Sequence, residues 1–332
     1  YEGKIGSVDS KPGQRITSPM VPIITVIEPC GHDIQYNGLC TLCGKDLTIS
    51  DYYEDVTKRA TINMSHDATG IRVSVDEAQK MEKKNAQRLR KLKKLSLIID
   101  LDQTIVHAYA SQDPKFEDWL IDNYTGPDAD TPREKRQLPS DIGAFFLPDS
   151  PHKYFIKLRP GLREFLDRVS ALYELHIYTM GTRHYAEAVA RVIDPDGRFF
   201  RERILSRDES GSLTQKSIRR LFPCDQSMVV MLDDRADVWQ WSPNLIKILP
   251  YAFFTGVGDI NSGHLPANST AVHKAMQEKK DEQAAEQGGD RGSKLVDNDC
   301  ELKVVGGVLE SIHETYYEEY ESRKMFDEFK SG

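Results

Sequence analysis

Two aspartates stand one residue apart at the end of an apolar stretch, in "LSLIIDLDQT", residues 95–104. If the backbone stays extended there, Asp100 and Asp102 point to the same side. Two such charges repel each other, and the pKa of one carboxyl group rises unless a cation lies nearby. A turn after a strand also favours aspartate. The pair at the end of a buried strand, followed by Thr104, indicates a metal-assisted active site, and Mg²⁺ is the hard cation that carboxylates bind.

Later segments supply matching groups. "LHIYTMG" ends near the hydroxyl of Thr179, Lys216 opens a short predicted helix, and "VVMLDDR" ends in Asp233 and Asp234. In phosphoryl transfer, one carboxylate attacks phosphorus, while a second carboxyl group protonates the leaving oxygen and then activates water. Mg²⁺, lysine and a hydroxyl can hold the phosphoryl oxygens. Glycosyltransferases also contain Asp-x-Asp, but they do not need the lysine or the second aspartate pair.

The elements that must position these groups alternate along the chain. Strand patterns cover residues 95–100, 174–181, 227–234 and 245–249, and helix patterns cover 159–173, 183–193 and 215–222. Such alternation predicts an α/β protein with a parallel sheet between helices. Parallel sheets carry their sites at the carboxyl ends of the strands. We therefore expect a Rossmannoid sheet whose carboxyl edge gathers the groups named above.

One segment, residues 108–153, interrupts the alternation. It is rich in Asp, Pro and aromatic residues, and it is long for a connection. Its aromatic residues either form walls for a Pro-rich peptide or pack into a small core of the insertion itself. Both alternatives stay open for Phe116, Trp119, Tyr124, Phe145 and Phe146.

A cluster of potential metal ligands lies near the N-terminus, in "CGHDIQYNGLCTLCG". Cys40-x-x-Cys43 followed by glycine has the form of a zinc knuckle, and Cys30 and His32 complete a tetrahedral set. The alternative is a metal-free turn with reduced cysteines. The odd number of cysteines and their clustering favour an intracellular protein over a disulfide scaffold.

The flanking regions differ in character from the centre. We expect a small β module over 1–50, a helix over 74–95, a polar linker over 263–300 and an acidic helix over 301–332. The sequence lacks an initiator methionine, so we expect the natural N-terminus to lie further upstream. The last helix carries an apolar stripe that packs on the main domain or on something C-terminal. The stripe comprises Val305, Leu309, Ile312, Tyr316 and Tyr320.

Composition narrows the class of protein. The net charge is −8 at a hydrophobic content of 39%, which argues against general nucleic-acid binding, since a basic face would be expected, and leaves a local basic pocket open. We also expect no sequence-specific nucleic-acid binding. No run approaches the roughly 20 apolar residues of a membrane span. We expect no membrane association.

The motifs resemble a known superfamily. "DLDQT", "YTMG", the helix at Lys216 and "LDDR" resemble the four motifs of the haloacid-dehalogenase superfamily of phosphotransferases. More narrowly, residues 90–262, with "KLRPGLREFL" and "YAFFTGVGDINS", are similar to the TFIIF-associating phosphatases of the RNA polymerase II C-terminal domain. "KPGQRITSPMVPIITVIEP" resembles a biotinyl or lipoyl module, without the lysine turn that carries those groups. "GGVLESIHETYYEEY" resembles the segment that precedes a BRCT domain in this family, and the chain stops before such a domain.

This resemblance implies roles for the first pair of aspartates and their partners. Asp100 is implied as the nucleophile, and Asp102 as the general acid and base, which also lends its backbone carbonyl to Mg²⁺. Thr104 supports their loop by hydrogen bonding. Thr179 and Lys216 are implied to hold the phosphate.

The same resemblance assigns roles to later residues. Asp234 is implied as a Mg²⁺ ligand, and Asp233 either binds Mg²⁺ or orients Lys216. Arg159 and Arg235 are implied to lie near the substrate. For Arg159, the alternative is a structural partner of an acidic loop.

The predicted function follows from these roles. We expect a catalytic domain over residues 74–262 that removes phosphate from serines of the polymerase C-terminal domain, with a nuclear location and TFIIF as a partner. Same-fold alternatives are a phosphatase of another phosphoprotein or of a small metabolite. A phosphopeptide-binding scaffold without turnover is the alternative from another class, although such a scaffold has no need for the acid at Asp102.

Overall fold

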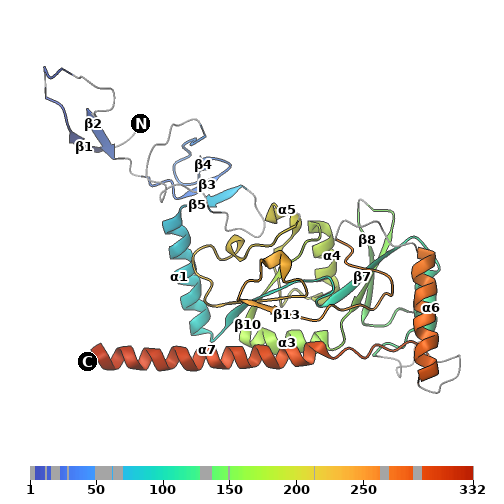
Figure 1. The fold of residues 1–332 in the computed structure, drawn as a ribbon. Helices are drawn as coiled ribbons and strands as arrows, with labels where there is room; N and C mark the ends of the chain where they lie inside the picture. The colour runs from blue at the N-terminus through green and yellow to red at the C-terminus, as the bar shows by residue number, and fades with distance from the viewer. Residues whose placement is uncertain are drawn as a thin grey trace. The chain divides into compact units, whose positions relative to one another are not determined.

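A computed structural model describes most of the chain in two compact units (Figure 1). The smaller unit comprises residues 1–84 and 222–225, and the larger comprises 85–221 and 226–332. The described residues are 4–11, 13–15, 23–27, 30–48, 62, 70–127, 137–148, 150–212, 214–261, 269–286 and 294–331.

The larger unit is built on a five-stranded parallel sheet with the order β11–β10–β6–β12–β13. The central strand β6 (Leu95–Ile99) lies between β10 (Tyr173–Tyr178) and β12 (Val229–Asp233). The edges are β11 (Ile204–Leu205) and β13 (Leu245–Lys247). Every residue of β6 is buried, which explains why its sequence is apolar except for Ser96, because a parallel sheet is covered on both faces.

Two amphipathic helices follow the first strands of this sheet. Helix α3 (Leu162–Leu172) and helix α4 (Arg183–Ile193) both bury an apolar stripe in the main core. The backbone N–H of Tyr185 donates to the side chain of Thr182, which caps α4. This cap fixes the start of α4 at the carboxyl edge of the sheet.

Short elements complete the sheet edge. They are α5 (Arg207–Ser210) and the 3₁₀ turns η2 (Ile218–Arg220) and η3 (Asp237–Trp239). Where the sequence predicts a helix over 215–222, the structure has only the single 3₁₀ turn η2. Pro223 disfavours helical backbone in the residue before it, which limits the length of the helix.

The insertion folds as an antiparallel sheet with the order β7–β9–β8. Its strands are β7 (Val106–Ser111), β8 (Ile142–Phe146) and β9 (Lys153–Leu158), and α2 (Phe116–Asn123) follows β7. Among the insertion's aromatic residues, Phe116 and Tyr124 are buried in a second core. This core also contains Tyr251, Phe253 and Phe254 from beyond the insertion, so these aromatic residues pack in a core that is not the insertion's own.

The remaining aromatic residues of the insertion behave differently. Trp119 is partly buried, and its indole N–H donates to Gln277 at 3.2 Å. Phe145 packs against the main core, stacked on Tyr154. Among the aromatic residues in the described part of the insertion, only Phe146, at 64% exposure, offers an open aromatic surface.

The polar segment expected as a linker contains a long helix, α6 (Ser269–Glu286). Val272 and Met276 of α6 are buried in the second core with Phe116. The prediction of a linker over 263–300 is therefore wrong for the residues of α6. The two apolar positions stand four apart, which is helical spacing, but the surrounding run of charged residues obscured them.

The C-terminal helix α7 (Glu301–Ser331) packs beside α3 (Figure 1). Val305 and Leu309 of its predicted stripe are buried, and the other members of the stripe pack on the main core. The hydroxyl of Tyr173 donates to the Leu309 carbonyl at 2.7 Å. The predicted stripe is confirmed, and it packs on the main domain.

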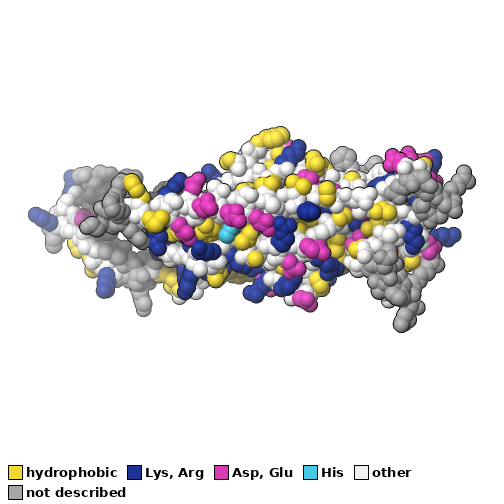
Figure 2. All heavy atoms as spheres, turned by 90° about the horizontal axis from the view of Figure 1, so that it is seen from below, with side chains coloured by type: hydrophobic (Ala, Val, Ile, Leu, Met, Phe, Trp, Pro, Cys, Tyr) yellow, Lys and Arg dark blue, Asp and Glu magenta, His cyan; other side chains and the backbone are white. Residues whose placement is uncertain are grey.

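The side of the molecule that carries α7 mixes charges of both signs (Figure 2). Exposed pairs join Arg168 to Glu310 and Lys93 to Glu321, each at 2.8 Å.

Across the residues described, none of the helices is long and apolar enough to cross a lipid bilayer.

The smaller unit contains two small antiparallel sheets. Strands β1 (Lys4–Val8) and β2 (Ile24–Ile27) pair with each other. The second sheet has the order β4–β3–β5, with β3 (Ile34–Tyr36), β4 (Leu39–Cys40) and β5 (Ile71–Val73). Because β5 lies beyond residue 50, this sheet extends past the predicted end of the β module.

Helix α1 (Val75–Lys91) follows β5 and continues into the larger unit. Its start is capped by the hydroxyl of Ser74, which accepts from the Glu77 backbone N–H at 3.2 Å. Acidic residues occupy its first turn and basic residues its last turn, as the helix dipole favours. The helix predicted over 74–95 is confirmed with an end four residues earlier.

Candidate active site

The predicted catalytic residues meet at the carboxyl edge of the parallel sheet. Asp100 directly follows the central strand β6, Asp233 ends β12, and Thr179 follows β10. These three strands are neighbours, so their ends lie side by side. The side chain of Lys216 reaches the same place from another segment. That segment is held by the backbone N–H of Lys216, which donates to the Val238 carbonyl at 2.9 Å.

The buried ammonium group of Lys216 joins two of the carboxylates. Its Nζ lies 2.5 Å from Asp100 Oδ1 and 2.6 Å from Asp233 Oδ2. Burial by itself lowers the pKa of Lys216, but the Asp100 and Asp233 carboxylates outweigh that effect and raise it. Lys216 is therefore a permanent cation beside the predicted nucleophile.

Asp233 is held as a partner of Lys216. Its Oδ2 also accepts from the indole N–H of Trp239 at 2.7 Å, and its Oδ1 accepts from the Arg235 backbone N–H at 2.8 Å. These donors fix the carboxylate in one orientation. Of the two roles left open for Asp233, orienting Lys216 has direct geometric support.

Thr104 connects the two strand ends that carry the aspartates. Its Oγ1 lies 3.2 Å from Asp100 Oδ2 and 3.3 Å from Asp234 Oδ1, and it accepts from the Asp234 backbone N–H at 3.1 Å. The hydroxyl has one proton, so it donates to one carboxylate at a time. Thr104 thus has the supporting position that the sequence predicts.

Asp102 has its own set of partners. The hydroxyl of Tyr185 donates to its Oδ1, and Asn261 Nδ2 donates to its Oδ2 at 2.7 Å. Burial, together with the charge of Asp259, raises the pKa of Asp102 to about 7, although the two hydrogen bonds act in the opposite direction. A carboxyl group that titrates near neutral pH suits both giving and taking a proton.

Three residues of this site were missed by sequence reasoning: Tyr185, Asn261 and Asp259. Tyr185 stands in the first turns of α4, where an aromatic residue on an amphipathic helix indicates core packing. Asn261 and Asp259 belong to "GVGDINS", a segment noted for its resemblance without a role for its individual residues. Only the fold brings this segment to Asp102.

The acidic residues form a group that fits a divalent cation. Carboxylate oxygens of Asp100, Asp233 and Asp234 all lie within 4.8 Å of one another, and all three residues are buried. Burial raises the pKa of Asp100 well above its usual range, despite Lys216, and burial with the charge of Asp233 raises that of Asp234 to about 6. One lysine does not balance these carboxylates, so the oxygen donor set suits Mg²⁺. The carboxylate of Asp102 is not in this group, which leaves its backbone carbonyl for the predicted metal contact.

These residues line one cleft. Thr179 lies in its wall, and its hydroxyl accepts from the Gly181 backbone N–H at 3.0 Å. Arg235 lies at the rim with a half-exposed side chain that pairs with Asp237 at 2.6 Å. Both residues are therefore near enough to meet a substrate in the cleft.

Arg159 is buried and hydrogen-bonded within the fold. It is 1% exposed, and its guanidinium donates two hydrogen bonds to Asp299, at 2.8 and 2.9 Å. Its Nη1 donates to the backbone carbonyls of Thr104 and Leu249, both at 2.9 Å. This geometry favours the alternative of a structural partner of an acidic segment, while a place near the substrate stays a prediction. Arg159 braces the catalytic loop against the segment before α7.

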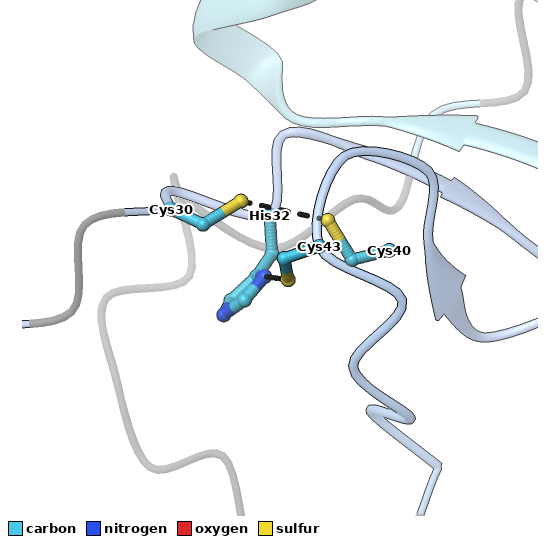
Figure 3. Close-up of side chains that lie close together, drawn as sticks. All are labelled: Cys30, His32, Cys40 and Cys43. Carbon is cyan, nitrogen blue, oxygen red and sulfur yellow. Dashed lines mark hydrogen bonds between the residues drawn. The ribbon is translucent and has the colours of Figure 1, made fainter. Parts of the chain in front are cut away.

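The other candidate ligands gather in the smaller unit (Figure 3). Cys30, His32, Cys40 and Cys43 each direct one ligand atom toward the others, within 4.8 Å. His32 and Cys40 are buried, Cys30 is half-buried and Cys43 is exposed. This Cys–His cluster is separate from the acidic residues of the cleft, all of which belong to the larger unit.

The fold defines the class of protein. A parallel α/β sheet with an insertion after the first strand is the haloacid-dehalogenase-like fold that the sequence predicts, and the solved neighbours bear this out. The chain belongs to the NLI interacting factor-like phosphatase family, whose family model matches residues 95–281. The matched segment extends beyond the predicted catalytic boundary at 262 and into α6.

Several relatives are phosphatases of the polymerase tail. The chain is 51% identical over 260 residues to the RNA polymerase II C-terminal domain phosphatase of Schizosaccharomyces pombe, covering 75% of this chain and 34% of that protein. It is 41% identical over 317 residues to the phosphatase of the same name from Saccharomyces cerevisiae, covering 91% and 42%. The chain thus spans about a third to two fifths of the length of these relatives.

A solved structure is also similar. It is that of the fission yeast RNA polymerase II CTD phosphatase Fcp1-R271A bound to beryllium fluoride, with a TM-score of 0.59 and 44% sequence identity. The likeness covers 74% of this chain and 70% of that one.

Proposed function

We propose that this chain is a Mg²⁺-dependent protein serine phosphatase that acts on the heptad-repeat C-terminal domain of RNA polymerase II. The convergence of Asp100, Asp102, Lys216 and Asp234 in one cleft is the observation that carries this proposal. Membership of a phosphatase family and similarity to named polymerase phosphatases support the reaction and the substrate.

In the first step, a carboxylate oxygen of Asp100 attacks the phosphorus of a phosphoserine. The bond between phosphorus and the serine oxygen breaks, and Asp102 transfers its proton to that oxygen. The products are a free serine and an aspartyl-phosphate on Asp100. The neutral form of Asp102 that this step needs is accessible because its pKa is raised to about 7.

In the second step, Asp102 accepts a proton from water as that water attacks the phosphorus. The bond between phosphorus and Asp100 breaks, inorganic phosphate leaves, and both carboxyl groups return to their starting states. Lys216, fixed by Asp233, and the hydroxyl of Thr179 hold phosphoryl oxygens while the charge moves.

The oxygens of Asp100 and Asp234 and the backbone carbonyl of Asp102 would hold Mg²⁺. When bound, Mg²⁺ supplies positive charge that offsets the repulsion between a phosphate dianion and the buried carboxylates. Thr104 supports this arrangement, because it contacts both carboxylate residues.

The biological setting is part of the same proposal. The relatives' names favour the phosphorylated polymerase tail as the substrate and hence a nuclear location. The resemblance in the sequence adds TFIIF as a partner. We propose no membrane association and no sequence-specific nucleic-acid binding.

The test compares phosphate release from a phosphoserine heptad peptide, a small aryl phosphate and a sugar phosphate in the presence of Mg²⁺. We expect kcat/KM for the peptide to exceed that for the sugar phosphate by roughly a hundredfold, because only the peptide contacts surface outside the cleft. Equal or faster turnover of the sugar phosphate would identify a metabolite phosphatase. Peptide binding without phosphate release would identify a scaffold.

A further inference from the structure

We propose that Cys30, His32, Cys40 and Cys43 bind one Zn²⁺ as a structural site that fixes the fold of the smaller unit. This site is independent of the proposed phosphatase reaction, since no residue of the catalytic cleft belongs to the cluster.

The distances between the side chains match a tetrahedral zinc site. The Sγ atoms of Cys30 and Cys40 lie 3.6 Å apart, and Cys43 Sγ lies 3.4 Å from His32 Nδ1 (Figure 3). With ordinary Zn–S and Zn–N bond lengths, two ligand atoms of a tetrahedron stand about 3.8 Å apart for two sulfurs and about 3.6 Å apart for sulfur and nitrogen. The cluster is within a few tenths of an ångström of both values.

The backbone around the cluster is shaped to bring the ligands together. The β3–β4 hairpin turns at Asn37 and Gly38, which both have positive φ, as a type I′ turn requires. After Cys40, the chain turns back at once, because the Gly44 N–H donates to the Cys40 carbonyl at 2.9 Å with Gly44 at φ +72°. This turn places Cys43 beside His32.

His32 supplies a second, independent observation. It is 2% exposed, and its backbone has φ +54°, a conformation that residues other than glycine adopt at a cost. Such backbone strain persists where the surroundings hold it in place, and it gathers at ligand sites. Here it aims a buried imidazole nitrogen at a cysteine sulfur.

The small sheet has little apolar core of its own. Within residues 30–48 and 70–74, the only buried apolar side chains are Cys40 and Val73, while Tyr36, Leu39 and Leu42 are exposed. A module of this size needs a disulfide or a metal to supplement its core. A bound metal contributes its binding free energy directly to folding.

The chemistry of the ligands selects the metal and the role. Three thiolates and one imidazole are soft and borderline ligands, which favour zinc over Mg²⁺. Four protein ligands close the coordination sphere, and such closed sites are structural, whereas catalytic zinc keeps one open position.

A disulfide between Cys30 and Cys40 is the competing arrangement. It needs a bond of about 2.0 Å between sulfurs, and it uses only two of the four ligands. Both cysteines are free in the structure. A disulfide would also not explain why Cys43 Sγ lies beside His32 Nδ1.

The first experiment measures zinc in the full chain by elemental analysis after purification in zinc-replete medium. We expect about one Zn²⁺ per chain for the wild type and less than a tenth of that for Cys40→Ser and Cys43→Ser, since each removes a ligand. Cys224→Ser and Cys300→Ser are the matched controls, because both cysteines are exposed and lie outside the cluster. They should keep the metal.

The second experiment guards against loss of zinc through misfolding of a variant. Wild-type chain is stripped with a chelator and refilled with Co²⁺, whose visible absorption reports tetrahedral thiolate ligands. The tetrahedral bands and restored resistance to proteolysis within residues 30–48 are expected. Zinc-free wild type, a Cys30–Cys40 disulfide found by mass spectrometry, or zinc retained by both cluster variants would overturn the proposal.

Discussion

The acidic cluster of the larger unit and the Cys–His cluster of the smaller unit are assembled by different means. In the first, Lys216 lies 116 positions from Asp100 in the sequence, and Asp100 is placed by a fully buried central strand. In the second, four ligands within residues 30–43 are brought together by one hairpin and one tight turn. The first cluster rests on a large hydrophobic core, and the second has almost none.

This difference indicates what holds the side chains of each cluster in place. The acidic site is organised by folding itself, so the fold should tolerate changes to its charges. The Cys–His cluster needs its metal to become ordered, so its integrity should depend on ligand removal. The two sites should therefore fail separately, and each of the following predictions tests that separation or its details.

The largest expected effect is that of Asp100→Asn on phosphate release. An amide cannot act as the nucleophile, so we expect a loss of roughly 10⁴-fold or more in kcat. The zinc content should stay at the wild-type value, while Cys43→Ser should lose zinc and keep kcat within about twofold. Asp196→Asn, which changes an exposed aspartate, is the charge-matched control. Loss of zinc in Asp100→Asn would show that the two sites are coupled.

Asp102→Asn should have the next largest effect, and the effect should depend on the leaving group. Without the acid, kcat on a phosphoserine peptide should fall by about 10³-fold, because a serine alkoxide is a poor leaving group. An aryl phosphate with an acidic phenol needs little protonation, so its first step should be nearly unchanged. Pre-steady-state release of the phenol measures this difference, and an equal loss in that first step on both substrates would assign Asp102 a purely structural role.

Arg159→Met should reduce stability and leave substrate affinity unchanged. The substitution removes the hydrogen bonds to the Asp299 carboxylate and to two backbone carbonyls, and leaves these acceptors without a donor in a largely buried position. We expect the free energy of unfolding of the larger unit to fall by about 3 kcal/mol, measured by denaturant titration. Arg163→Met, on the surface of α3 nearby, is the control. A rise in KM at full stability would restore the role in substrate binding that the sequence suggested.

Tyr185→Phe should have the smallest effect. It removes one hydrogen bond to Asp102 and keeps the ring in the core, so Asn261 alone positions the carboxylate. We expect kcat to fall about tenfold on the phosphoserine peptide, in line with one hydrogen bond to a charged group. The thermal midpoint, recorded in parallel, separates this effect from a packing defect. If kcat is unchanged while the thermal midpoint falls, Tyr185 is only a core residue.

Much of the candidate site could be predicted because most of its residues stand at the ends of apolar strands, a pattern that is visible in the sequence. Each of Asp100, Thr179 and Asp233 follows or ends an apolar strand, and parallel strands must end at one edge. Lys216 was predicted as a site residue from its position between the "YTMG" and "LDDR" motifs. The same strand and helix patterns predicted the sheet of the larger unit and the helices around it.

The remaining features depend on tertiary partners that no local pattern reveals. Arg159 has the same sequence context whether it binds substrate or Asp299, which lies 140 residues away. Helix α6 lies in a charged run, and only the second core shows that its residues Val272 and Met276 are core positions. Tyr185 looks like a core residue because its ring is one, and only its hydroxyl serves the site.

The most direct test of the proposed reaction is to trap the covalent intermediate. Asp102→Asn chain is mixed with an aryl phosphate and Mg²⁺, quenched in acid, and treated with borohydride, which reduces an acyl-phosphate to an alcohol. Because the base that activates water is missing, the intermediate should accumulate. Peptide mass spectrometry should then find Asp100, and no other residue, converted to homoserine. Release of the phenol with Asp100 unmodified, or modification at a different carboxylate, would contradict the account.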